Sequence, residues 1–248
     1  MVVPERIREA ATFGNRSVGG WPARTGAYDR VKRWVEKPKN DINDNERDKW
    51  GGGDGDTLLA CVAQCHGASR DEAMEAIEML EYLLAHGADP NISNRWGMTP
   101  LHHACETGFD FGSAAIPILL AAGADVHAKT TECGYYPCCD MGPYRLRGET
   151  PLSRAVQWFR GGRIMGVRRE GMEYISRLLR HGARLDDCWG GASMEACLRH
   201  VEERLGVDPE LGVRIDSDIR EDIAENEHFV ACKALVRKVR YERGPRRF

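Results

Sequence analysis

The chain has 248 residues, a formal net charge of −3, and a composition that is 42% hydrophobic and 29% charged, as in ordinary soluble globular proteins. Because no overall positive charge is present, its main task is not expected to be binding nucleic acid or an anionic membrane. No run of 18 or more apolar residues occurs, so we expect no helix that spans a bilayer.

The first residues of the chain do not resemble a secretion signal. Charged side chains interrupt the segment that such a signal keeps apolar, namely Glu5, Arg6, Arg8 and Glu9. Nine cysteines are present, and an odd number without an export signal indicates reduced thiols. We therefore expect an intracellular protein of the cytoplasm or nucleus.

The first predicted helix covers residues 28–35, and the segment 1–27 before it is expected to be poorly ordered. Asp41, Ile42 and Asn43 follow this helix, as at the end of an incomplete first repeat unit. The glycine-rich segment 51–55 lacks the lysine and hydroxyl residue of a phosphate-binding loop. We expect it to be a flexible connection.

Two patterns then recur three times along the chain. The first combines glycine, threonine and leucine, at 55–59, 97–102 and 148–152. Threonine can cap a helix by accepting a backbone N–H, and proline suits the first helical turn. The second pattern places apolar residues at i, i+3 and i+4 before a Gly-Ala pair, at 80–89, 116–125 and 175–184. Each unit is thus predicted as a capped helix, a connection, an apolar helix ending at glycine, and an extended finger.

These residues resemble the ankyrin repeat. The resemblance lies in TPLHHA at 99–104 and in the endings HGAD and AGAD, and it covers roughly residues 28–205. It implies an all-α ankyrin-repeat solenoid of about four to five stacked helix-turn-helix units, with β-hairpin fingers, helical end caps and a concave binding surface. It also implies that His102 makes structural hydrogen bonds between units, and we expect His103 to face the concave side.

The spacing of the patterns departs from an ordinary repeat in several places. We expect enlarged loops at 129–147 and 160–170, and the segment 206–248 as a C-terminal capping helix with a basic tail. Within the second helix of the middle unit, Ser113 is expected to act as the N-cap. Pro117 would then lie close enough to the helix start to be tolerated.

The resemblance also implies which positions contact a partner. In the best-matched unit they are Arg95, Trp96, Met98, Glu106 and Thr107, and in the next unit Leu146, Arg147, Glu149, Gln157 and Trp158. The counterparts in the first unit are Gly53, Asp54, Asp56, Gln64 and Cys65. Tryptophan and arginine often anchor interfaces, so the two Arg–Trp groups predict an aromatic and basic binding strip. Alternatively, Trp96 merely packs against the next finger.

Two segments suggest other functions. Cys133, Cys138 and Cys139 could bind zinc and give this loop a zinc-stabilised or enzymatic role, or form a disulfide in an oxidising compartment. A convincing second pair of zinc ligands is missing, so a reduced surface loop is the plainer interpretation. The run 233–248 has seven basic residues and one acidic residue. It could contact nucleic acid, direct nuclear import or bind an acidic partner, or simply be a solvated end.

Taken together, the sequence predicts a protein-interaction module, a scaffold or adaptor, rather than an enzyme. No catalytic triad, phosphate loop or paired carboxylate motif occurs, and Cys61 and Cys65 are expected to be small buried thiols on one helix face. We expect no cofactor, no membrane partner and a monomer, while the identity of the partner protein stays open.

Overall fold

The computed structural model describes residues 3–12, 27–45, 55–65, 70–107, 109–131, 148–160 and 169–184. These residues form helices and no β-strand. The helices are α1 (Glu5–Ala11), α2 (Ala27–Val35), α3 (Leu58–Ala63), α4 (Arg70–Ala85), α5 (Pro100–Ala104), α6 (Phe109–Ala121), α7 (Pro151–Arg160) and α8 (Arg169–Arg180). The prediction of an all-α chain is confirmed for this part, whereas β-hairpin fingers are not. No helix of the described residues is both long and apolar enough to cross a membrane.

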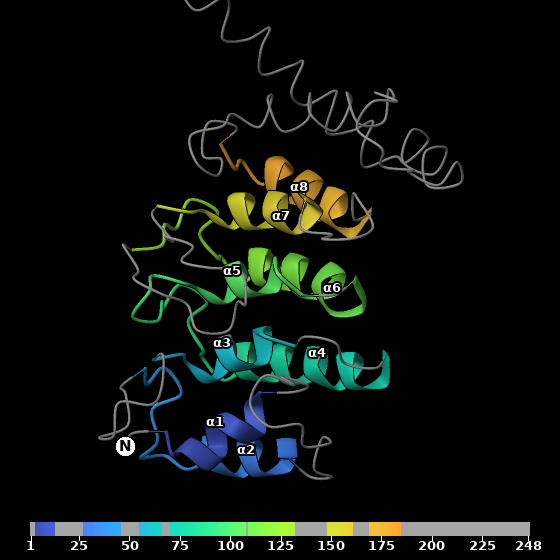
Figure 1. Ribbon diagram of the computed structural model, residues 1–248. Helices are drawn as coiled ribbons and strands as arrows, with labels where there is room; N and C mark the ends of the chain where they lie inside the picture. Colours follow the sequence, from blue (N-terminus) through green and yellow to red (C-terminus); the bar gives the residue numbers. More distant parts are fainter. Residues whose placement is uncertain are drawn as a thin grey trace, which may run out of the picture. The chain divides into compact units, whose positions relative to one another are not determined.

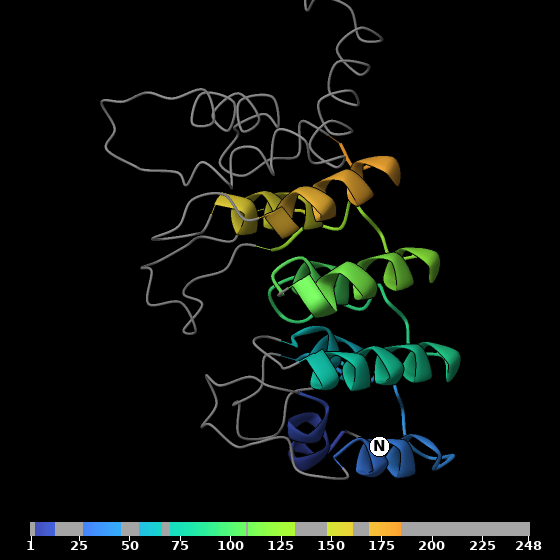
Figure 2. The same cartoon turned by 90° about the vertical axis from the view of Figure 1, so that its right-hand side faces the viewer.

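The chain divides into two compact units, Met1–Pro151 and Leu152–Phe248. In the first unit, the pairs α1–α2, α3–α4 and α5–α6 form three successive layers (Figure 1). Helix α3 contacts α5, α4 contacts α6, and α1 contacts both α2 and α3. Seen from the side, the layers follow one another in chain order (Figure 2). Leu83 and Leu119 are fully buried, as the periodicity predicts.

The helix starts follow from their capping residues. Thr57 precedes α3, and its hydroxyl accepts the backbone N–H of Ala60 at 3.2 Å. Thr99 precedes α5, and its backbone N–H donates to Nδ1 of His102 at 3.1 Å. Pro100 occupies the first turn of α5, where its missing N–H costs nothing.

The connections that follow α2, α4 and α6, which we call fingers, are joined by asparagine side chains. Asn43 donates its amide to the carbonyl of Gly87 at 3.0 Å and accepts the N–H of Asp89 at 2.8 Å. Asn91 makes the same pair of bonds one layer further, to Gly123 at 3.1 Å and Asp125 at 2.8 Å. Each asparagine therefore links the start of its own finger to the end of the next layer's second helix.

Helix α1 lies in the segment for which the sequence predicts little order. Its Ile7, Ala10 and Ala11 are buried, and Arg8 forms an ion pair with Asp44 at 3.0 Å. The charged residues between these apolar positions conceal the helical pattern. Helix α1 pairs with α2, so the first layer is a complete helix pair instead of the incomplete unit expected.

The start of α6 also differs from the prediction. The helix begins at Phe109, so Ser113 is not its N-cap and Pro117 lies inside it. Proline removes one backbone hydrogen bond within a helix. The buried Phe111, Ile116 and Leu119 hold α6 against its neighbours, and this packing offsets the loss of one bond.

In the second unit, Tyr174, Ile175 and Leu178 of α8 are buried. Arg177 pairs with Glu173 one helical turn earlier, at 2.6 Å, and Gly182 follows the helix with φ +91°. Leu178 is buried as predicted. Most of the two enlarged loops and the whole segment 206–248 lie outside the described residues, so these assignments stay predictions.

Candidate functional site

The finger between α4 and α5 ends in a tight turn built by Asn94. Its backbone N–H donates to the carbonyl of Met98 at 2.9 Å, and its carbonyl accepts the N–H of Gly97 at 2.9 Å. Its side-chain oxygen accepts the N–H groups of Trp96 at 2.9 Å and Met98 at 3.0 Å. Residues 94–98, which we call the fingertip, are therefore held by one asparagine.

The fingertip carries a stacked arginine and tryptophan. The Arg95 guanidinium carbon lies 4.1 Å from the centre of the Trp96 ring, a cation–π geometry. Both side chains are half-buried. The Trp96 carbonyl accepts the N–H of Thr131 at 2.8 Å, so the backbone of the fingertip rests on the following finger while part of each side chain stays accessible.

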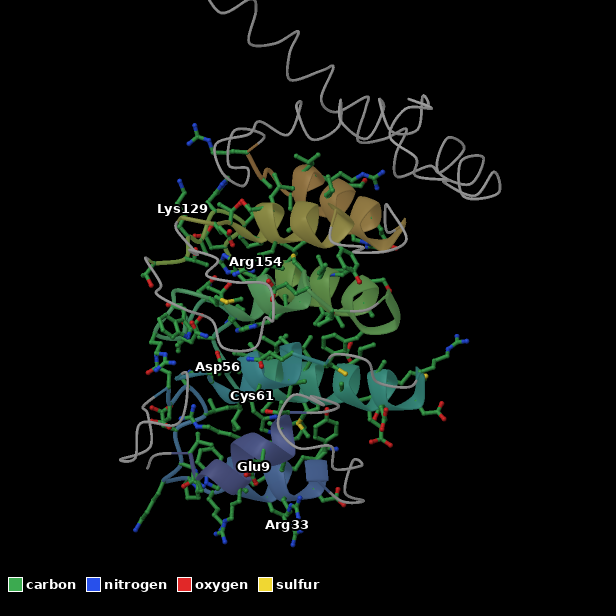
Figure 3. The ribbon with its side chains drawn as sticks, viewed as in Figure 1. Glu9, Arg33, Asp56, Cys61, Lys129 and Arg154 are labelled. Carbon is green, nitrogen blue, oxygen red and sulfur yellow. The ribbon has the colours of Figure 1, made fainter. Side chains whose placement is uncertain are left out.

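A largely buried carboxylate contacts the fingertip through the side chain of Asn94. Asp56, at the layer of α3 (Figure 3), accepts from Gln64 Nε2 at 2.6 Å and from Asn94 Nδ2 at 2.8 Å. His103 Nε2 lies 3.4 Å from the oxygen that Asn94 contacts. Burial alone raises the pKa of Asp56, but the charge of His103 beside it and the hydrogen bonds from Gln64 and Asn94 together outweigh it and hold the pKa below its usual value.

The other predicted contact residues divide by burial. Glu106 and Gln64 are half-buried. The remaining described ones are buried, and they are Met98, Thr107, Glu149 and Cys65. His103, expected on the concave side, is also buried, against Asp56. The buried positions offer little or no side-chain surface to a partner. A match to a repeat gives a residue's place in the pattern but not how deeply its side chain is buried.

Several predicted contacts cannot be located. Four of them lie outside the described residues, namely Gly53, Asp54, Leu146 and Arg147. Two more belong to α7, but the structure does not describe their side chains, and these are Gln157 and Trp158. Of the predicted aromatic and basic strip, the structure therefore places Arg95 and Trp96.

His102 has the structural role that the resemblance implies. Its Nδ1 lies 3.1 Å from the backbone N of Thr99 and 2.9 Å from the hydroxyl of the same residue. Its Nε2 lies 3.1 Å from the carbonyl of Glu149. Since both ring nitrogens are engaged in the interior, His102 is not placed to transfer protons to a substrate.

The described thiols are also structural. Cys61, Cys65 and Cys105 are buried and form no disulfide, and burial is as expected for the first two. Burial raises the pKa of Cys61 and of Cys65 to about 12, so neither is an activated nucleophile. No group of three or more potential metal ligands occurs among the described residues. Cys133, Cys138 and Cys139 lie outside them, and zinc binding there stays a prediction.

A comparison with family models decides the assignment. Residues 65–116, which include α4, the fingertip, α5 and part of α6, match the model described as ankyrin repeats (many copies). This segment of the chain is ankyrin-repeat sequence. A search among curated proteins finds no match. Ankyrin repeats generally mediate protein–protein interaction.

Proposed function

We propose that this ankyrin-repeat chain is a non-enzymatic scaffold or adaptor that binds a partner protein through its fingertip. The observation that carries the proposal is the Arg95 guanidinium stacked 4.1 Å from the Trp96 ring, with both side chains half-buried. Stacking holds the arginine in place, so less conformational entropy is lost when a partner binds it.

The chemistry of this pair specifies the partner. A guanidinium carries a permanent positive charge that favours a carboxylate beside it, and an indole ring offers a large apolar surface with little flexibility. The partner surface is therefore an acidic side chain beside an apolar or aromatic one. Glu106, which follows α5, and Gln64, which caps the end of α3, are both half-buried and extend the contact.

A non-enzymatic role is supported by the chemistry of the groups that could react. Both nitrogens of His102 are used in structural contacts, and the thiols of Cys61 and Cys65 have raised pKa values. An intracellular setting agrees with the thiols of Cys61 and Cys65, which form no disulfide.

The test compares the intact chain with the double variant Arg95→Ala with Trp96→Ala. The intact chain is used as bait, and the partner proteins that it captures are identified by mass spectrometry and purified. We expect the dissociation constant of the identified partner to rise at least about tenfold, while the free energy of unfolding changes by about 1 kcal/mol. The matched control is Lys32→Ala with Tyr82→Ala, because Lys32 Nζ lies 5.4 Å from the Tyr82 ring centre on α2 and α4. Equal binding by the two double variants would reject the fingertip as the site.

A further inference from the structure

The carboxylate of Asp56 connects elements that are far apart in the sequence. It belongs to the segment before α3, yet it accepts a hydrogen bond from Asn94, which is 38 residues later. Its side chain is 13% exposed, so it is turned largely inward. Its own backbone carbonyl accepts a hydrogen bond from Arg8 of α1. A group placed in this way contributes little surface to a partner.

Asn94 transmits the position of this carboxylate to the fingertip. A side-chain amide has donors at one end and an acceptor at the other. In Asn94 the donor end contacts Asp56 at 2.8 Å, and this contact directs the oxygen toward the N–H groups of Trp96 and Met98. If the amide turned over, both N–H groups would lose their acceptor.

We propose that Asp56 and Asn94 are positioning residues, which hold the Arg95–Trp96 pair in the conformation that binds a partner. The inference rests on the proposed function only in its last step, because the geometry of the fingertip can be measured without a partner. Arg95 and Trp96 contact the partner, whereas Asp56 and Asn94 act through the backbone of the turn.

The surroundings of Asp56 keep its carboxylate in the accepting form. His103 of α5 and Gln64 at the end of α3 contact its two oxygens at 3.4 Å and 2.6 Å. An ionised carboxylate only accepts hydrogen bonds, so Asn94 must present its donor end to it. The lowered pKa of Asp56 agrees with this arrangement.

The experiment records ¹H–¹⁵N spectra of the full chain, with the Trp96 indole signal assigned from a Trp96→Phe variant. In Asn94→Asp, two carboxylates replace a donor–acceptor pair, and in Asp56→Ala the acceptor is removed. We expect the Trp96 indole and the Gly97 amide signals to move in both variants by more than they move in Glu78→Gln. This control removes an exposed carboxylate on α4.

The decisive variant exchanges the two residues, Asp56→Asn together with Asn94→Asp. The new amide donates to the new carboxylate, which keeps a free oxygen for the N–H groups of Trp96 and Met98. We expect the signals to return toward those of the unchanged chain, a non-additivity that defines direct coupling. The thermal midpoint of each variant is measured in parallel. A variant that keeps its midpoint but shifts the fingertip signals has a moved fingertip and is not generally unfolded.

Two results would overturn the proposal: unmoved signals in both single variants, or an exchanged variant no closer to the unchanged chain than Asn94→Asp. Neither depends on a partner, so the positioning role can fail while Arg95→Ala with Trp96→Ala still abolishes binding. Conversely, the exchange can succeed while the fingertip proves not to be the binding site.

Discussion

Among the described glycines with positive φ, Gly97 has the least room for a side chain. Its φ is +75°, and a Cβ added there would lie 2.6 Å from the backbone N of Thr131. A side chain would both strain the turn and push away the finger on which the fingertip rests. We expect Gly97→Ala to lower the free energy of unfolding by about 3 kcal/mol, measured by urea denaturation.

Gly123 supplies the control for this prediction. Its φ is +88°, and nothing lies within 4 Å of an added Cβ. Gly123→Ala should therefore cost only the conformational strain, about 1 kcal/mol. If the two variants lost equal stability, the close approach of Thr131 to Gly97 would not matter energetically.

At this scale the sequence predicts residues whose role is local. The capping threonines and the glycines after helices are recognisable because their partners lie within a few positions. His102 was placed through the resemblance to a known repeat. The Asp56–Asn94 contact joins residues 38 positions apart, and no local pattern indicates it, although the spacing Asn94-x-x-Gly97 could have suggested a turn. The burial of Met98 and Thr107 likewise depends on neighbouring layers.

Helix α1 is held by contacts distant in sequence. Its Arg8 side chain pairs with Asp44 at 3.0 Å, and the N–H of Val3 donates to the same carboxylate oxygen at 2.7 Å. Deleting residues 1–12 removes both of these contacts to the buried Asp44 carboxylate. It also removes the buried apolar side chains of α1. We expect the free energy of unfolding to fall by about 3 kcal/mol or more, measured by urea denaturation.

The companion variant Asp44→Asn identifies the cause of this loss. In the full chain it should destabilise, because Arg8 loses its charged partner. In the truncated chain it should destabilise less, because the charge of Arg8 is no longer there to be lost. If Asp44→Asn had the same effect in both chains, the coupling between α1 and Asp44 would be refuted.

The helices were predicted well where strong periodicity coincides with a capping or terminating residue. Helix α2 covers Ala27–Val35, one residue longer than expected, and α4 ends just before Gly87. Helix α1 was missed because charged residues separate its apolar positions. The start of α6 was misplaced because Ser113 resembles a cap, whereas packing around Phe111 extends the helix toward Phe109.

At the scale of the molecule, the layered order of helix pairs in the first unit follows from the repeated pattern. Each pair presents an apolar face that only a neighbouring pair can cover. The layers are not joined by apolar contacts alone. Asp56 and its partners connect α1, α3, the fingertip and α5, so ionisation of one group affects several layers together.

The pH dependence of stability should reveal this group. The pKa of Asp56 is lower in the folded chain than its ordinary value, which is about 3.9 in an unfolded chain. Its contribution to stability is therefore fully present above that value and is lost as the pH falls through the folded pKa. The side chain introduced by Asp56→Asn cannot ionise, so the excess stability of the unchanged chain over this variant should shrink as the pH falls below about 4.

Urea denaturation of both proteins across this range measures the difference directly. Because the charge of His103 is a main cause of the lowered pKa, the decline should be smaller when both proteins also carry His103→Gln. A stability difference between the unchanged chain and Asp56→Asn that stays constant down to about pH 3 would mean that the Asp56 pKa is the same in both states. The carboxylate would then hold the layers by hydrogen bonds alone, without a net contribution from its charge.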